Sequence, residues 1–187
     1  MNEKLHSWLV ANKFNVNKSK IEEVKLFLFS HHARALICVY IVSHSRNKYH
    51  TLIIRKFLRS HYHIECSCRQ IGYRLMLPHP RNIIIVAESI GDNVQVNQNV
   101  TIGGNMHKKK QREWGEQKLP IIGNNVVVYT NAVVGGPIVI EDNVIIGANC
   151  TCTHDIPANT LVYNKQYISS RKIKVLEGTY TIFKQNN

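Results

Sequence analysis

The sequence predicts a mainly β protein, in which a parallel β-helix of stacked triangular coils follows a short α-helical region. After Gln70 a branched apolar residue returns at every sixth position, with Gly, Asn and Asp in between. Between Ile21 and Tyr62 the apolar residues instead recur at spacings of three and four, which is the helical period. The chain of 187 residues is 44% hydrophobic, which excludes extended disorder and fits one domain, or one domain with a small appendage.

The apolar positions between Ile21 and Tyr62 predict two or three amphipathic helices, with a break at Asn47–Tyr49. Basic residues fill the polar faces of these helices. The longest apolar run, Ala35–Val42, covers about eight residues, whereas a bilayer needs about 20. Because Met1–Asn17 lacks an apolar core followed by a cleavage site, we expect no secretory signal and a cytoplasmic protein.

A six-residue repeat predicts the β-helix. Units such as Ile90–Gln95, Val96–Thr101 and Ile140–Ile145 place an apolar side chain at position one and a small or medium apolar one at position five. Both positions point inward, while Gly or Asn supplies the positive φ angles that tight corners need. Three units form one coil of about 18 residues, so Ile71–Tyr163 predicts about four coils, with one bulged corner before Ile90.

The cysteines form two C-x-C pairs, Cys66 with Cys68 and Cys150 with Cys152, besides the single Cys38. Four thiolates from two such pairs are one possible zinc site, although structural zinc sites more often use C-x2-C or longer spacings. The second pair falls on positions five and one of the repeat, where small core side chains belong. We therefore expect reduced structural thiols and no metal.

Residues 105–118 interrupt the repeat, and they are rich in Lys, Arg and Glu. A stacked coil cannot hold these residues, so they predict an extruded loop, which is either functional or a solvated charged hairpin. The expected organisation is therefore a helical region 1–65, a β-helix 66–163 with the loop 105–118, and a tail 164–187.

Two segments resemble a known family. Ile71-Gly72-Tyr-Arg-Leu-Met-Leu-Pro78-His79 and Val100-Thr-Ile-Gly103-Gly104 are similar to the hexapeptide-repeat acyltransferases of the serine acetyltransferase branch, in which such segments carry the catalytic histidine and precede an extruded loop. The resemblance implies a left-handed β-helix. That handedness is implied by the resemblance alone, since parallel crossovers are otherwise right-handed.

Within that branch, the short basic helical region and the form His79-Pro80-x-x-Ile83 are more similar to capsule, exopolysaccharide and O-antigen O-acetyltransferases. Pro78 stands where the serine enzymes have an aspartate, and Leu119 where they have a second, serine-binding histidine. The resemblance thus implies transfer of acetyl from acetyl-CoA to a sugar hydroxyl of a surface polysaccharide. Serine O-acetyltransferase, or transfer to another small acceptor, is the alternative, and a non-catalytic polyanion-binding protein is a third.

Acetyl transfer to an alcohol needs a base, and His79 is the candidate because imidazole titrates near working pH. Pro78 cannot orient this ring, so Glu65, Glu88 or a backbone carbonyl is a possible substitute. His107, in the loop, is the alternative base.

Trp114, on the same loop, is a candidate for stacking on an acceptor sugar. The resemblance also implies that acetyl-CoA lies in a groove between neighbouring subunits of a homotrimer. Its expected contacts are Gly103, Gly104, Thr130, Gly147, Ala148, Lys165, Arg171 and Lys172.

The formal charge of +12 comes from 24 Lys and Arg against 12 Asp and Glu. Residues 122–162 contain no Lys or Arg, so the cations concentrate in the helical region, the loop and the tail. The sequence has no helix-turn-helix, zinc-finger or RNP-like motif, which argues against nucleic acid. We expect acetyl-CoA and an acidic or lipid-linked glycan as the anionic partners, with possible peripheral contact at the inner face of the membrane.

Overall fold

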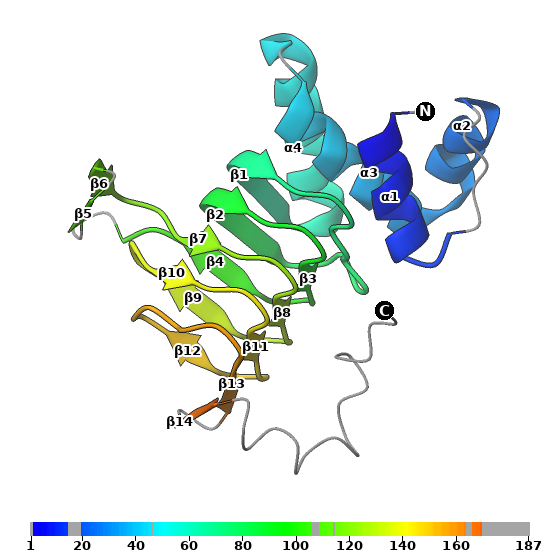
Figure 1. Ribbon diagram of the computed structural model, residues 1–187. Helices are drawn as coiled ribbons and strands as arrows, with labels where there is room; N and C mark the ends of the chain where they lie inside the picture. Colours follow the sequence, from blue (N-terminus) through cyan, green and yellow to red (C-terminus); the bar gives the residue numbers. More distant parts are fainter. Residues whose placement is uncertain are drawn as a thin grey trace.

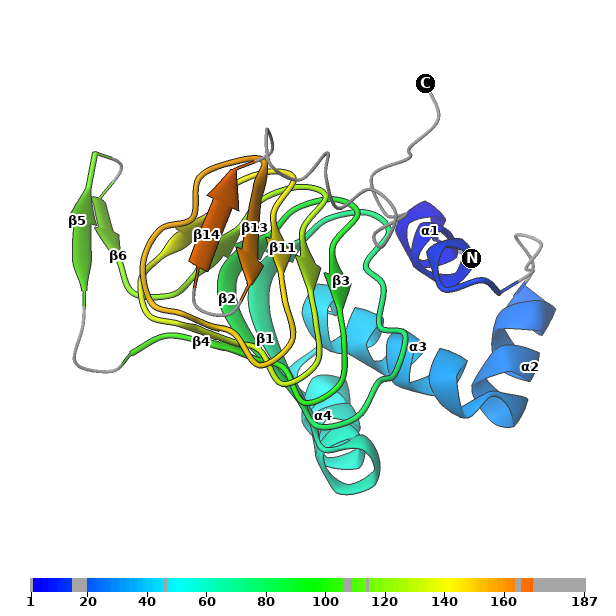
Figure 2. The ribbon, with the colours of Figure 1, turned by 90° about the horizontal axis from the view of Figure 1, so that it is seen from below.

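The computed structural model describes residues 2–14, 20–45, 47–105, 109–113, 115–163 and 166–169. Its body is a parallel β-helix whose coils stack in levels from β1 (Ile64–Ile71) down to β13 (Thr160–Tyr163), as Figure 1 shows. The view along the stack shows the three sides of each coil (Figure 2). The described helices lie near the end of the stack at β1, and two of them pack directly on that strand (Figure 1). The predicted fold class, a mainly β solenoid with hexapeptide repeats behind a few helices, is therefore confirmed.

Three faces make up the prism. The first face contains the start of β1 (Ile64–Ile71), the start of β2 (Ile83–Ile90), β4 (Thr101–Gly103), β9 (Val133–Gly135) and β12 (Thr151–Cys152). The second contains the ends of β1 and β2, then β7 (Ile121–Ile122) and β10 (Val139–Ile140). The third contains β3 (Gln95–Val96), β8 (Val127–Val128), β11 (Ile145–Ile146) and β13 (Thr160–Tyr163), with the antiparallel β14 (Gln166–Ser169) at its end.

The first face has five levels, whereas the repeat predicts about four coils. The additional level begins at Ile64, where β1 continues through a corner as one strand. β2 does the same, pairing with β4 near Ile85 and with β7 near Ile90, which accommodates the extra residue expected before Ile90. Because β1 turns its corner without Gly or Asn, its hexapeptide pattern is hard to recognise in the sequence.

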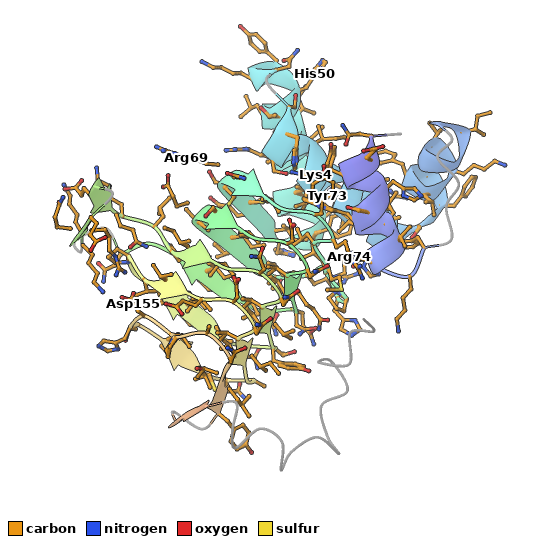
Figure 3. All side chains as sticks on the ribbon, viewed as in Figure 1. Lys4, His50, Arg69, Tyr73, Arg74 and Asp155 are labelled. Carbon is orange, nitrogen blue, oxygen red and sulfur yellow. The ribbon has the colours of Figure 1, made fainter. Side chains whose placement is uncertain are left out.

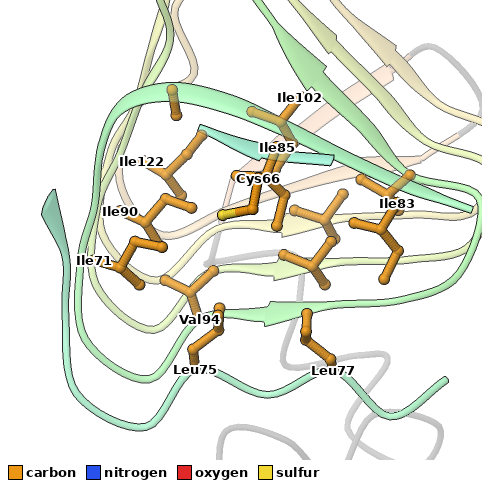
Figure 4. Packing of buried hydrophobic residues seen from close by; sticks show 14 of the residues in the cluster. Cys66, Ile71, Leu75, Leu77, Ile83, Ile85, Ile90, Val94, Ile102 and Ile122 are labelled. Carbon is orange, nitrogen blue, oxygen red and sulfur yellow. The ribbon is translucent and has the colours of Figure 1, made fainter. Parts of the chain in front are cut away.

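Inward side chains of successive levels form one continuous core. Ile71, Ile90 and Ile122 occupy paired positions on the second face and are 1–2% exposed. Figure 4 shows these three isoleucines stacked beside Leu75 and Val94. Complete burial of each such side chain contributes about 1.5–3 kcal/mol, so the repeat itself supplies the main stabilisation of the prism.

Asparagines at the corners explain the Asn content of the repeat. Asn125 and Asn143 have φ of 55° and 59°, in the left-handed region that Asn tolerates better than most residues. The Asn93 side-chain amide donates to Asn125, which donates to Asn143, which donates to Asn159, at 2.9–3.0 Å. Each corner is thereby bonded to the next level.

The helical region comprises α1 (Glu3–Ala11), α2 (Lys20–Phe29), α3 (His31–His44) and α4 (Lys48–Tyr62). A break occurs close to the expected Asn47–Tyr49, but it lies earlier: α3 ends at His44 and α4 begins at Lys48, with Asn47 as its cap, so Lys48 and Tyr49 are helical. Helix α1 was not predicted, because its few apolar residues lie among polar ones. Trp8 of α1 is fully buried, and its indole N–H donates to the carbonyl of Gly72 at 2.9 Å. None of the described helices has the length and apolar content needed to cross a bilayer.

The described cysteines are free thiols. Cys150 and Cys152 occupy buried core positions, as the repeat predicts, and Cys66 is buried on the first face. Burial raises the pKa of the Cys66 and Cys152 thiols to about 12, so both remain protonated. Among the described residues no group of three or more His, Cys, Asp or Glu is placed to hold a metal ion.

Candidate active site

The edge that joins the third face to the first carries several of the predicted residues, and we call it the histidine edge. It contains the turn with His79, followed at lower levels by Gln98, Thr130 and Asn149. Backbone N–H groups connect these levels, since Asn99 donates to Arg81, Asn131 to Gln98 and Asn149 to Thr130, at 3.0–3.3 Å. His79 and the predicted acetyl-CoA contacts Thr130, Gly147 and Ala148 therefore lie along one edge of the prism.

His79 lies in an exposed turn between Pro78 and the buried Pro80. The turn is closed by a 2.8 Å bond from the Arg81 N–H to the His79 carbonyl. The N–H groups of Asn82 and Ile83 donate to Tyr62 and His63 at the end of α4, at 3.0 and 3.2 Å. The helical region thus fixes the backbone that presents the imidazole.

A pocket of about 250 Å³ opens beside His79. Its lining residues are His31, His32, Tyr62, Pro78, His79, Pro80 and Arg81. The Tyr62 hydroxyl donates to the carbonyl of His31 at 2.9 Å, which joins α4 to the start of α3. The pocket is therefore formed where the helical region meets the first turn of the prism.

His32 forms part of this pocket with an incompletely satisfied ring. Burial lowers the pKa of His32, a hydrogen bond with the Leu77 backbone opposes that shift, and the charge of His79 lowers the pKa further. The Nε2 atom of His32 is buried and has no hydrogen-bond partner. At neutral pH a neutral imidazole thus lies close to His79.

The two carboxylates considered as orienting groups are directed elsewhere. Glu65 pairs with Arg59 at 3.0 Å, and Glu88 pairs with Arg69 at 2.9 Å. Neither lines the pocket at His79, because Glu65 points outward from β1 and Glu88 lies at the corner where β2 turns to the second face. Within one chain, the structure does not bring either carboxylate to His79.

The edge between the first and second faces carries the extruded segment, and we call it the arm edge. The arm is a hairpin of β5 (Lys110–Arg112) and β6 (Gly115–Gln117) that projects to one side of the prism (Figures 1 and 2). His107 and Trp114 lie outside the described residues. The predicted protruding loop is observed, and it lies on a different edge from His79.

Asp155, labelled in Figure 3, attaches the arm to the prism, and no sequence pattern predicted this role. The Arg112 guanidinium donates to both Asp155 carboxylate oxygens at 2.7 and 2.8 Å, and the Lys110 ammonium adds a bond of 2.6 Å. These hydrogen bonds hold the pKa of Asp155 well below its usual range, and Arg112 has a larger effect than Lys110. The buried Gln117 amide also donates to the carbonyls of Leu119 and Ile138, so the base of the arm is bonded to the prism as well.

A second cavity, of about 540 Å³, lies at the base of the arm. Arg69 and Glu88 line one side of it, and Glu116–Leu119 of the arm together with Ile121 line the other. The Glu116 carboxylate accepts from Lys118 and Lys109, at 3.0 and 3.2 Å, which lowers the pKa of Glu116. Unlike the pocket at His79, this cavity therefore contains charges of both signs.

The four expected glycine and alanine contacts have different surroundings. A Cβ added to Gly103 would meet no atom within 4 Å, whereas one added to Gly104 would lie 2.7 Å from the Lys118 carbonyl oxygen. A Cβ on Gly147 would lie 2.9 Å from the Val162 carbonyl oxygen. Gly104 and Gly147 are therefore required by packing, while Gly103 and the exposed Ala148 leave room for a ligand.

Gly135 extends the open surface at Gly103, and the sequence analysis did not select it. The two glycines are register partners on β9 and β4, and an added Cβ at Gly135 would also meet nothing within 4 Å. Gly135-Gly136 repeats the pair Gly103-Gly104 one level below, which was an available signal. Lys165, Arg171 and Lys172, expected near the phosphates of acetyl-CoA, lie outside the described residues.

Comparisons with known proteins identify a repeat family and related enzymes. Residues 120–154 match the bacterial transferase hexapeptide family (six repeats). Serine acetyltransferases of Staphylococcus epidermidis and Staphylococcus xylosus are each 38% identical over 94 residues, which is 50% of this chain and 41% of theirs. The chain thus spans about two fifths of the length of these curated relatives.

Solved serine acetyltransferases share the fold over nearly the whole chain. The Neisseria gonorrhoeae enzyme aligns with a TM-score of 0.66 and 20% identity, over 90% of this chain and 67% of its own. Isoform 3 of Entamoeba histolytica, in complex with cysteine, aligns with a TM-score of 0.64 and 21% identity, over 89% and 59%. Residues 120–154 therefore carry a bacterial transferase hexapeptide repeat, within a fold that the chain shares with solved serine acetyltransferases.

Proposed function

We propose that the protein is an acetyl-CoA-dependent O-acetyltransferase with His79 as its general base. The observation that carries the proposal is the placement of His79 beside a pocket, on the same edge as Thr130 and Ala148. The comparisons support the proposal, because the relatives with 38% identity are serine acetyltransferases.

The reaction needs one proton carrier and one electrostatic donor. The acceptor oxygen attacks the thioester carbonyl while His79 takes the hydroxyl proton, and a backbone N–H near Gly103 stabilises the tetrahedral oxyanion. Collapse of this intermediate breaks the C–S bond and releases the CoA thiolate, which takes up the proton from the imidazolium. The products are an O-acetyl ester and free CoA.

Two edges of one chain cannot meet, so we propose that the complete site forms between copies in a homotrimer. The histidine edge of one copy would face the arm edge of the next, and acetyl-CoA would lie between them. This arrangement would gather Thr130 and Ala148 from one copy and the open surface of Gly103 and Gly135 from the other, leaving no side chain in the way of the cofactor.

Serine, or another small hydroxyl compound, is the better supported acceptor, because the relatives are serine acetyltransferases. This favours the alternative over the surface glycan that we expected from the sequence. A sugar hydroxyl remains the second candidate on one observation: Pro78 and Leu119 occupy the places where the resemblance has an aspartate and a serine-binding histidine. Leu119 presents an apolar side chain beside Gly104 at the exit of the arm.

We propose a cytoplasmic location, with the outer face of α4 directed to anionic lipid where a membrane is contacted. Tyr49, Leu52 and Ile53 are 82%, 67% and 68% exposed on this helix. Lys48, Arg55, Lys56 and Arg59 are exposed near them, and α4 has no acidic residue. A basic helix with an outward apolar patch has the chemistry of an interfacial helix.

The test is a thiol-release assay with acetyl-CoA against serine, glucose, glucuronate and capsular oligosaccharides. We expect turnover with serine, and a loss of at least about a hundredfold in His79→Ala with folding and acetyl-CoA binding retained. Turnover with glycans alone would establish the second candidate instead. Absence of turnover with every acceptor, or a near-normal rate in His79→Ala, would refute the mechanism.

A further inference from the structure

The pocket at His79 has a chemical character that the acetyl transfer alone does not require. Among its lining residues, all of which lie in the described part of the chain, there is no carboxylate. Arg81 supplies a full positive charge, and His31 and His32 form the first turn of α3. The N-terminal end of this 14-residue helix adds partial positive charge at the same place.

Arg81 is available for a ligand. Its side chain lies exposed at the rim of the pocket, and no ion pair to it occurs among the described residues. Tyr62 lines the same pocket, where burial raises its pKa and the positive charges of Arg34 and Arg81 oppose that rise. Arg34 differs from Arg81 because its guanidinium already donates to the carbonyls of Phe27 and Leu28, at 2.7 and 2.6 Å.

His32 contributes the second polar feature of the pocket. Its buried Nε2 has no partner, and a buried polar atom without a hydrogen bond is costly. That nitrogen is shielded from solvent, so a ligand in the pocket contacts other atoms of the ring. The pocket thus combines the cation of Arg81 with the neutral ring of His32.

We propose that this pocket binds the carboxylate of the acceptor, with Arg81 as its principal partner. The inference rests on the proposed function, because it places the acceptor hydroxyl at His79, two residues from the carboxylate partner. A guanidinium suits this role, since its planar fork matches a carboxylate in two parallel hydrogen bonds.

The size of the pocket limits the acceptor. About 250 Å³ is below the usual range for drug-sized ligands, so it fits an amino acid or one sugar unit. Serine and a terminal uronic acid share the required combination of hydroxyl and carboxylate. Arg81 would therefore select for acidic acceptors whichever of the two is the natural one.

Binding without acetyl-CoA provides the test, read from the NMR signals of the histidine rings. The probes are serine against serinol, which lacks the carboxylate, and glucuronate against glucose. In the parent protein we expect one acid, at least, to shift the signals of His79 and His32, while its uncharged partner binds weakly. Whichever of serine and glucuronate binds more tightly then identifies the molecule that supplies the carboxylate.

Arg81→Gln should weaken binding of the acid by about tenfold or more, the usual effect of losing a charged hydrogen bond, and leave the uncharged partner unchanged. Arg81→Lys should recover part of the loss. Arg74→Gln, on the same coil but outside the pocket, is the control for the charge change.

In the transfer assay, Arg81→Gln should raise the KM of the acid and leave kcat largely unchanged. Equal binding of acid and uncharged partner, equal affinity in Arg81→Gln, or no shift with any probe would overturn the inference. Carboxylate-dependent binding without acetyl transfer would instead retain it and refute the proposed function.

Discussion

Gly103 and Gly104 are neighbours on the arm edge, but their surroundings impose different demands. Space is open above Gly103, whereas Gly104 is in contact with the backbone at Lys118 and the side chain of Leu119. Two alanine substitutions at adjacent positions therefore separate ligand binding from stability.

We expect Gly104→Ala to lower the free energy of unfolding by about 1–3 kcal/mol, because the backbone at the exit of the arm must move. Gly103→Ala should leave thermal unfolding nearly unchanged and raise the KM for acetyl-CoA several-fold, since the new methyl group occupies the open surface. Thermal denaturation and initial-rate kinetics on both variants provide the measurement. Equal melting temperatures for the two variants would contradict the packing assignment of Gly104.

Single residues also show what the sequence could not predict. His79 was found because its segment resembles a known motif, and Cys150 and Cys152 because the repeat assigns them to the core. His31, His32 and Arg81 were not found, since Arg81 is 49 positions after His32 and only the docking of α3 on the first coil brings them together. A pocket between two elements leaves no local pattern in either of them.

At the scale of elements, periodicity decided which parts of the fold were predictable. The six-residue period fixes β7 to β12, where each unit has both its apolar positions and its Gly or Asn corner. It fails at β1, which turns without such a corner, so the fifth level was missed. Helix α1 was missed for a related reason: only Leu5, Trp8 and Leu9 are buried, too few to establish a helical period.

The outer face of helix α4 predicts binding to anionic lipid. Its buried side faces the prism through Leu58 and Tyr62, and its outer side combines the apolar Tyr49, Leu52 and Ile53 with cations. The protein should bind vesicles containing phosphatidylserine and bind phosphatidylcholine vesicles weakly, with affinity falling as salt rises.

Co-sedimentation with the two kinds of vesicle measures this difference. Lys56→Gln should weaken binding about fivefold, because each basic residue near an anionic surface contributes about 1 kcal/mol, while Arg74→Gln should have less effect. Equal binding to the two kinds of vesicle would refute the assignment of this face. So would concentration-dependent self-association through α4 without vesicle binding.

At the scale of the whole molecule, the triangular prism keeps its catalytic parts apart. His79 is on the edge between the third and first faces, and the arm is on the edge between the first and second, so the first face separates them. Trimer formation would place the arm of one copy against the histidine edge of the next, which gives each site two contributing chains.

Mixing two inactive variants tests this arrangement directly. His79→Ala removes the base but keeps the arm, and Arg112→Ala keeps the base but removes two of the three side-chain bonds between the arm and Asp155, leaving only that of Lys110. Each variant alone should have little activity. After unfolding and refolding together in equal amounts, about a quarter of the sites should pair an intact His79 with an intact arm from the neighbouring copy, and the mixture should recover about a quarter of the parent rate. Separately refolded variants, mixed afterwards, are the control. Recovery no higher than in that control, with both variants folded and trimeric, would place the base and its arm in the same chain.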